Sequence, residues 1–144
     1  MSDITAPLRE RIGWLLLKSH RNVKRMADKR LAAIGVSTAH IAILELLRAT
    51  PGLSQATIGT ALEIDRTSIG VTIAELEAAG IVRRVVDATD RRGYAIRLTA
   101  AGRALAEKAS ERAVAAQEQF LAPLDARERR ELVRLLQRLV GDSG

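Results

Sequence analysis

The sequence predicts a mainly helical protein with one small β-hairpin. Its 144 residues are 47% apolar but only 2% aromatic, so the core is built from aliphatic side chains. Ala and Leu dominate these and favour helices packed on helices. Apolar residues recur at helical spacing along most of the chain. Residues 81–98, by contrast, place β-branched and alternating segments on both sides of a polar loop, which is typical of a hairpin.

The charge balance and the missing residue types narrow the possible functions. The chain has 23 Lys and Arg against 17 Asp and Glu, a net charge of +6, which favours an anionic partner. It has no Cys, which excludes disulfides, cysteine–zinc sites and thiol switches. With only two His, we expect no metal and no cofactor. No apolar run could span a bilayer and no signal peptide is visible, so we expect a cytoplasmic protein without membrane contact.

The first helix is expected over about residues 5–35. Thr5 can act as its N-cap, and Pro7 stands where a first helical turn tolerates proline. The apolar pattern runs to about Ala33, and Gly35 is a candidate left-handed cap. A helix of about 40 Å, at 1.5 Å per residue, extends beyond any small core, so part of its apolar stripe needs another partner.

Three shorter helices follow, and the first of them can be capped by Ser37 or Thr38 and is ended by Thr50-Pro51-Gly52. The next is capped by Ser54 and ends near Leu62, and the last is capped by Asp65 and ends at Gly80. The link between these last two helices is about three residues long. That spacing predicts a helix-turn-helix.

The hairpin and two more helices complete the chain. Residues 81–86 and 94–98 are the expected strands. Thr99 can cap a long Ala-rich helix that Pro123 breaks. Asp125 then begins a capping box for the last helix. Its apolar stripe consists of Leu132, Leu135, Leu136 and Leu139.

This order predicts a winged helix-turn-helix within residues 36–99. The flanking parts, residues 5–35 and 100–140, are amphipathic helices without an obvious core of their own. Their simplest use is to pack against each other and against a second copy of the chain. We therefore interpret residues 1–144 as one domain, with a central DNA-binding part and helical dimerisation parts at both ends.

The helix over residues 66–79 has one face suited to DNA. Ile69, Ile73 and Leu76 follow helical spacing and should face inward. The candidate recognition residues on the other side are Arg66, Thr67, Ser68, Val71 and Thr72. An arginine can bind guanine, hydroxyls can bind bases or phosphates, and methyl groups can contact thymine in the major groove. A solvated, well-capped helix face is the alternative.

Two further segments could add contacts. Ser54 and Gln55, at the start of the preceding helix, are candidates for an N-cap and a phosphate contact. Asp90, Arg91 and Arg92 lie in the hairpin loop, and arginine suits the narrow minor groove. Asp90 could orient an arginine through a charge-assisted hydrogen bond. A solvated polar turn is the alternative for this loop.

Several segments together resemble the MarR family of bacterial transcriptional regulators. They are Leu53-Ser54-Gln55, residues 64–68, 76–84 and 90–94, and Leu98-Thr99-Ala100-Ala101-Gly102. The most specific piece is Asp-x-Arg in the hairpin loop, followed shortly by Leu-Thr-x-x-Gly. The resemblance implies a homodimeric repressor that reads a palindromic operator in double-stranded DNA. It also implies release by a small-molecule effector, often an aromatic acid, and gives Arg92 the place of the family's wing arginine.

The sequence departs from this family at two points. Many members carry a basic residue in the middle of the recognition helix, where this chain has Gly70 and Val71. Residues 41–80 hold two basic and five acidic groups, a net charge of −3, so base contacts should rest mainly on Arg66, Thr67 and Ser68. The peroxide-sensing branch of the family needs a cysteine, and its mode of regulation is therefore excluded.

Trp14, His20 and His40 are candidates for an effector pocket between the helical base and the DNA-binding part. Ordinary core or surface positions are the alternative for each. Two rival functions remain: a winged helix that binds only proteins, and a small helical enzyme. The arginines of the hairpin loop argue against the first. The second lacks a Gly-rich phosphate loop, HExxH and GxSxG, so we expect no enzyme.

Overall fold

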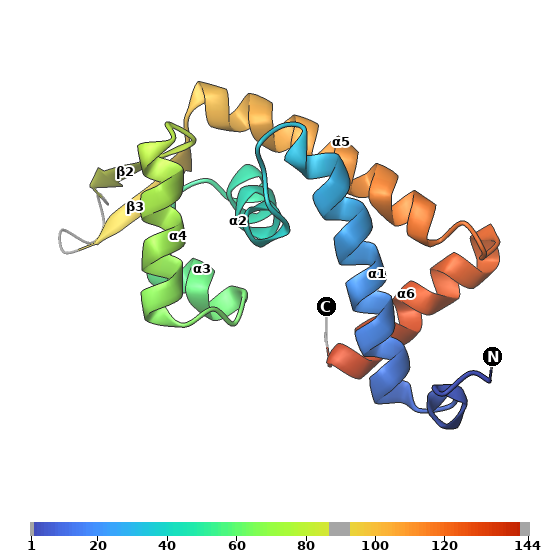
Figure 1. The fold of residues 1–144 in the computed structure, drawn as a ribbon. Coiled ribbons are helices and arrows are strands. Elements are labelled where there is room, and N and C mark those ends of the chain that lie inside the picture. The colour runs from blue at the N-terminus through green and yellow to red at the C-terminus, as the bar shows by residue number, and fades with distance from the viewer. Residues whose placement is uncertain (1, 87–92, 142–144) are drawn as a thin grey trace. The chain divides into compact units, whose positions relative to one another are not determined.

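The computed structural model describes residues 2–86 and 93–141 (Figure 1). The chain forms two compact units. One combines Met1–Met26 with Val114–Gly144, and the other is Ala27–Ala113. Two long helices, α1 (Ile12–Ala32) and α5 (Ala100–Phe120), contribute to both units. The structure confirms the predicted fold class, mainly helical with a small antiparallel sheet.

The Ala27–Ala113 unit contains the helix-turn-helix and the sheet. Its complete elements are α2 (Thr38–Ala49), β1 (Leu53–Ser54), α3 (Gln55–Ala61), α4 (Arg66–Ala78), β2 (Val82–Val86) and β3 (Tyr94–Leu98). Their apolar faces meet in one core. Its fully buried members include Leu31, Leu44, Ile58, Ile73 and Ile96. This core fixes α3, α4 and the sheet relative to one another, which is what a DNA-reading surface requires.

The sheet is three-stranded and antiparallel, in the order β1-β3-β2. The β2–β3 hairpin is confirmed, with Val82 paired to Leu98 and Val86 paired to Tyr94. Strand β1 was not predicted, because two residues are too short to show an alternating pattern. Side chains alternate between the faces of the hairpin, so Val82 and Leu98 enter the core while Arg83 and Arg97 pair on the opposite face.

The junction between the sheet and α5 is tightly packed. The Thr99 hydroxyl donates to the Gly80 carbonyl oxygen at 2.6 Å and accepts from the Gly102 N–H at 2.9 Å. This confirms Thr99 as a helix cap. A Cβ atom added to Gly102 would lie 1.9 Å from the carbonyl oxygen of Ile81. Only glycine therefore allows α5 to start so close to the Ile81 backbone, just before β2.

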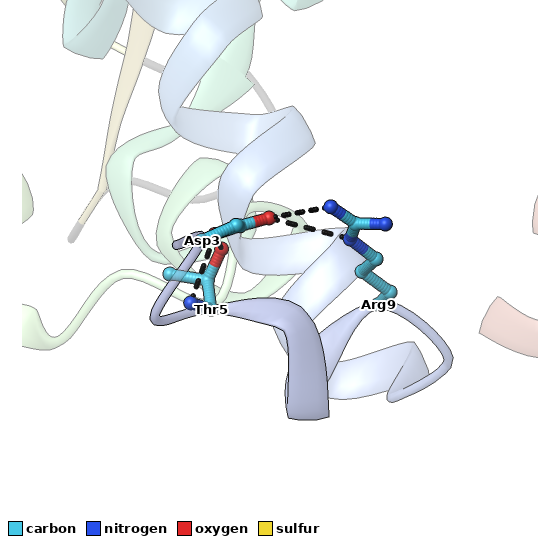
Figure 2. A network of polar contacts seen from close by, with 3 residues as sticks. All are labelled: Asp3, Thr5 and Arg9. Atoms are coloured by element: carbon cyan, nitrogen blue, oxygen red, sulfur yellow. Dashed lines mark hydrogen bonds and ion pairs between the residues drawn. The ribbon is translucent and has the colours of Figure 1, made fainter. Parts of the chain in front are cut away.

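The expectation of one continuous first helix from Thr5 is wrong. A short 3₁₀ helix, η1 (Ala6–Leu8), comes first, and α1 begins only at Ile12. Figure 2 shows the polar contacts of this segment: the Asp3 carboxylate accepts from the Thr5 N–H at 2.9 Å, the Thr5 hydroxyl at 2.6 Å and the Arg9 guanidinium at 2.8 Å. These bonds close a compact turn. They lower the pKa of Asp3 to about 2, with the Thr5 hydroxyl as the largest cause.

The end of the chain follows the sequence prediction. α5 ends at Phe120, before Pro123, and α6 (Ala126–Val140) follows. The capping box is confirmed: Asp125 accepts from the Glu128 N–H at 2.8 Å, and Glu128 accepts from the Asp125 N–H at 3.1 Å. No helix in residues 2–86 and 93–141 is long and apolar enough to cross a membrane.

Candidate nucleic-acid interface

The turn between α3 and α4 sets the position of the recognition helix. Glu63 has a left-handed backbone, with φ at 54°, which is unusual for a residue with a side chain. The next N–H, that of Ile64, donates to the Gly59 carbonyl oxygen at 2.8 Å. Asp65 then caps α4 by accepting from the Ser68 N–H at 2.9 Å. The predicted helix-turn-helix is therefore present.

Gly59 lets α3 and α4 approach each other closely. A Cβ atom at this position would lie 3.1 Å from the Ile64 carbonyl oxygen and 3.3 Å from a methyl group of Ile69. Both contacts are tighter than ordinary van der Waals packing. Gly59 and Glu63 thus shape the motif; the turn at Glu63 was expected, but its left-handed backbone and the role of Gly59 were not.

The outer face of α4 is accessible, as its spacing predicts. Arg66, Thr67, Ser68 and Val71 are exposed, and Thr72 is half-buried. The opposite face is in the core, where Ile69, Ile73 and Leu76 are buried. The first turn of α4 therefore presents a guanidinium and hydroxyl groups beside the N-terminal end of the helix, which favours contacts with negative charge.

Two candidate recognition residues, Ser68 and Thr72, already interact with neighbours at the start of α4. A hydrogen bond from the Ser68 hydroxyl is the largest cause that lowers the pKa of Asp65, and the Ser68 N–H adds to it. The Thr72 hydroxyl donates to the Ser68 carbonyl oxygen at 2.9 Å. Because these groups stabilise the helix itself, Arg66 and Thr67 are the residues of the first turn best placed to contact bases.

Ser54 and Gln55 lie at the start of α3. Ser54 is the predicted N-cap: its hydroxyl oxygen accepts from the Thr57 N–H at 3.0 Å. The Gln55 amide oxygen is buried without a hydrogen-bond partner among the described residues. A Cβ atom on Gly70 would lie 3.3 Å from the Gln55 amide nitrogen, so the Gln55 side chain crosses toward α4.

A hollow of about 890 Å³ lies between α3, the start of α4 and the sheet. Ser54, Gln55 and Arg66 line it together with Arg84 and Tyr94. Arg84 also forms an ion pair of 3.6 Å with Glu77, which connects β2 to α4. Arg84 and Tyr94 were not predicted, although their alternation along the strands places both on this face. Asp90, Arg91 and Arg92, the predicted wing contacts, lie outside the described residues.

The three candidate effector residues are divided between the two units. Half-buried Trp14 and exposed His20 are in the unit that contains Met1–Met26. His40 is in the Ala27–Ala113 unit, where its Nε2 lies 3.8 Å from a Glu75 carboxylate oxygen. None of the three lines the hollow beside α4. The shared effector pocket therefore stays a prediction.

Comparison with known proteins identifies the chain. The MarR family model matches residues 34–93. The HTH-type transcriptional repressor Rv2887 of Mycobacterium tuberculosis is 30% identical over 131 residues, which cover 91% of this chain and 94% of the relative. The chain belongs to the MarR family. This MarR-family chain is accordingly a transcriptional regulator.

Solved MarR-family structures share its fold over most of its length. Rv2887 in complex with DNA superposes with a TM-score of 0.75 at 29% identity, covering 89% of this chain and 96% of that one. The repressor CouR bound to a 23-mer DNA duplex has a TM-score of 0.86 at 26% identity, with 98% and 99% covered. Rv2887 in complex with salicylic acid gives 0.73 at 30% identity, with 89% and 95% covered.

Proposed function

We propose that this MarR-family chain is a homodimeric repressor that binds a palindromic operator and is released by a small-molecule effector of the aromatic-acid class. The observation that carries the DNA assignment is the exposed, capped first turn of α4. This turn borders a hollow that Arg66 and Arg84 both line. Two relatives support it, since Rv2887 and CouR were both solved with DNA. The complex of Rv2887 with salicylic acid supports the effector class.

The proposed contacts divide by groove. Arg66 and Thr67 read base edges in the major groove, assisted by the Val71 and Thr72 methyl groups. Ser68 and Ser54 hold the helix starts at the phosphate backbone, with the Gln55 amide nearby. The loop residues Asp90, Arg91 and Arg92 serve the adjacent minor groove.

The dimer is proposed to form through residues 5–35 and 100–140, which leaves residues 36–99 for DNA. The apolar stripe of α6 supports this assignment: Leu139 is 72% exposed and Leu135 is 41% exposed in the single chain. Side chains of this kind are normally covered, and a second copy of the chain is the simplest cover. Dimerisation also matches a two-fold symmetric operator.

We further propose that the chain catalyses no reaction and acts in the cytoplasm, where the DNA is. Its family consists of transcriptional regulators, and the sequence carries no recognised catalytic motif. A winged helix that binds only proteins is the second candidate. The exposed Arg66 beside the hollow favours DNA over that candidate.

Fluorescence anisotropy with the DNA upstream of the protein's own gene tests the proposal. We expect binding that survives competitor DNA, and a log affinity that falls steeply with log salt because several phosphate contacts release counterions. Oxidants should have no effect, since no thiol is present. Added salicylic acid should weaken the complex. Binding that competitor DNA abolishes, or that is insensitive to salt, would contradict a sequence-specific DNA-binding function.

A further inference from the structure

Four arginine side chains line one small hollow at the base of the wing. The hollow has a volume of about 180 Å³, and its polar lining consists of Arg48, Arg83, Arg97 and Arg103. They come from four different elements, α2, β2, β3 and α5. The remaining lining is apolar: Leu47, Pro51 and Leu98. The fold thus brings together four positive charges that no sequence motif links.

In the part of the chain that the structure describes, these guanidinium groups have no carboxylate partner. The side chains of Arg48, Arg83 and Arg97 make no hydrogen bond or ion pair with any residue of the described ranges. Arg103 donates to a neutral acceptor, the Leu98 carbonyl oxygen, at 3.2 Å. No Asp or Glu lines the hollow. Four neighbouring like charges repel one another, so an anion held among them would relieve an existing repulsion.

The backbone leaves room for this arrangement. A Cβ atom on Gly52 would lie 3.3 Å from the Arg97 Nη2 atom, so the guanidinium lies directly over the glycine. Gly52 has φ at +86°, which glycine adopts without strain. The neighbouring Arg84 differs from these four arginines. It faces the other side of the sheet and forms an ion pair of 3.6 Å with Glu77.

The operator read by α4 is not the natural ligand of this cluster. Arg83 and Arg97 are paired on the sheet face opposite to Val82 and Leu98, which pack into the core. Their pair also lies toward the end of the hairpin remote from its loop. The hollow beside α4 is lined instead by Arg84 and Tyr94, from the other face of the sheet. The cluster therefore forms a second positive surface.

We propose that this four-arginine surface docks an acidic, Asp- and Glu-rich segment of a partner protein. Guanidinium groups bind carboxylates through two parallel hydrogen bonds, which suits arginine better than lysine. The hollow is smaller than pockets that enclose organic ligands, and its four arginines are all exposed. Four arginine side chains from four elements can bind several carboxylates of one acidic segment. The apolar lining can receive an aliphatic side chain that lies between two of these carboxylates.

Binding of a labelled peptide of alternating Asp and Glu to the full-length protein tests this proposal. The variant Arg83→Glu with Arg97→Glu removes the central pair, and we expect its dissociation constant for the peptide to rise about tenfold or more. Lys29→Glu with Lys108→Glu is the matched control, with the same charge change at exposed positions of the same unit. The control should stay within about twofold of the wild type.

Operator binding is measured on the same proteins, so that failure of the docking proposal is distinct from failure of the DNA proposal. Equal loss of peptide binding in both variants would show general charge attraction and overturn the proposal. Selective loss of operator binding in the arginine variant would make the surface a phosphate contact and also overturn it. Full displacement of the peptide by inorganic phosphate at equal concentration would show that the surface binds any small anion, and this result would overturn the proposal as well. If the Glu variant fails to fold, Arg48→Gln with Arg103→Gln should show the same selective loss.

Discussion

The Asp65 side chain accepts a hydrogen bond from the Ser68 backbone N–H at 2.9 Å, at the first turn of α4. The Ser68 side chain, followed by this backbone bond, is the largest cause that lowers the pKa of the Asp65 carboxyl. The cap satisfies an N–H group that has no partner inside the helix. It therefore fixes the turn that carries Arg66 and Thr67, so that stability and DNA reading depend on the same residue.

Replacement of this cap should affect the fold and DNA binding together. Asp65→Ala should lower the melting temperature and weaken operator binding, because the first turn of α4 loses its cap. Asp65→Asn keeps an acceptor oxygen, so at neutral pH it should lower the melting temperature less than Asp65→Ala does. Thermal melts and anisotropy on the three proteins check this. An Ala variant that melts and binds like the wild type would show that the cap is dispensable.

The same carboxyl should give stability a defined pH dependence. The pKa of Asp65 in the folded chain lies below its ordinary value of 3.8, so the unfolded chain binds the proton more readily. The contribution of Asp65 is therefore complete above the ordinary pKa and is lost as the pH falls through the folded pKa. Asp65→Asn should lack this component. Acid unfolding curves of the two proteins should converge as the pH falls; parallel curves would contradict the assignment.

Gly102 should be intolerant of even one added carbon. A Cβ atom there would lie 1.9 Å from the Ile81 carbonyl oxygen, and backbone cannot move aside as a flexible side chain can. We expect Gly102→Ala to destabilise the fold by about 3 kcal/mol or more, at the upper end of overpacking effects. Gly13→Ala is the control, because nothing lies within 4 Å of its added Cβ, and it should be neutral or stabilising by up to about 1 kcal/mol. Urea unfolding of both variants measures the difference.

The leucine stripe of α6 should be required for dimerisation. Leu135→Glu with Leu139→Glu places charges where we propose that a second chain packs, and each leucine contributes roughly 1.5–3 kcal/mol when buried. The variant should sediment as a monomer and lose affinity for a palindromic site. Arg130→Glu, at an exposed position of the same helix, should remain dimeric. A dimeric leucine variant would place the interface elsewhere.

Sequence alone predicted most of the elements because their ends carry local signals. Asp65 and Asp125 cap the helices that were expected to begin there, and Thr99 caps α5. The burial of Ile69 and Ile73 follows from helical spacing. Each of these features depends on residues within one turn of each other, which a single sequence displays directly.

The features that sequence missed depend on contacts between distant segments or on unusual backbone. Strand β1 exists only through its pairing with β3, where Leu53 faces Ile96. The Asp3–Arg9 contact replaces the first turn of the expected helix. Glu63 takes a left-handed turn that its residue type does not favour. The four-arginine surface has the same origin, since its members meet only after folding.

Arg66 should determine part of the operator sequence. It is exposed in the first turn of α4, where a guanidinium can bind guanine through two hydrogen bonds. Arg66→Ala should cost about 1–3 kcal/mol and relax preference at one symmetric pair of operator positions. Affinities for single-base variants of the operator measure this. Uniform weakening on all of them would instead assign Arg66 to a phosphate.

Replacement of Arg92 should weaken DNA binding without changing the sequence preference. Its place in Asp90-Arg91-Arg92, next to Gly93, matches the wing arginine of the MarR family, although it lies outside the described residues. A guanidinium in the minor groove reads groove width and negative potential, because the pattern of donors and acceptors there is degenerate. Arg92→Ala should therefore weaken binding by about 1–3 kcal/mol on the operator and its single-base variants alike.

The comparison of Arg92→Ala with Arg66→Ala separates the two grooves. Both variants should keep the wild-type melting temperature, because Arg66 is exposed and Arg92 belongs to a polar loop sequence. A loss of affinity at constant stability then reports a lost DNA contact rather than a damaged fold. Because a minor-groove arginine adds an electrostatic contact, Arg92→Ala should also reduce the slope of log affinity against log salt. If Arg92→Ala binds every duplex like the wild type, the wing does not contact DNA, and affinity must come from α4 and the positive charges outside the hairpin loop.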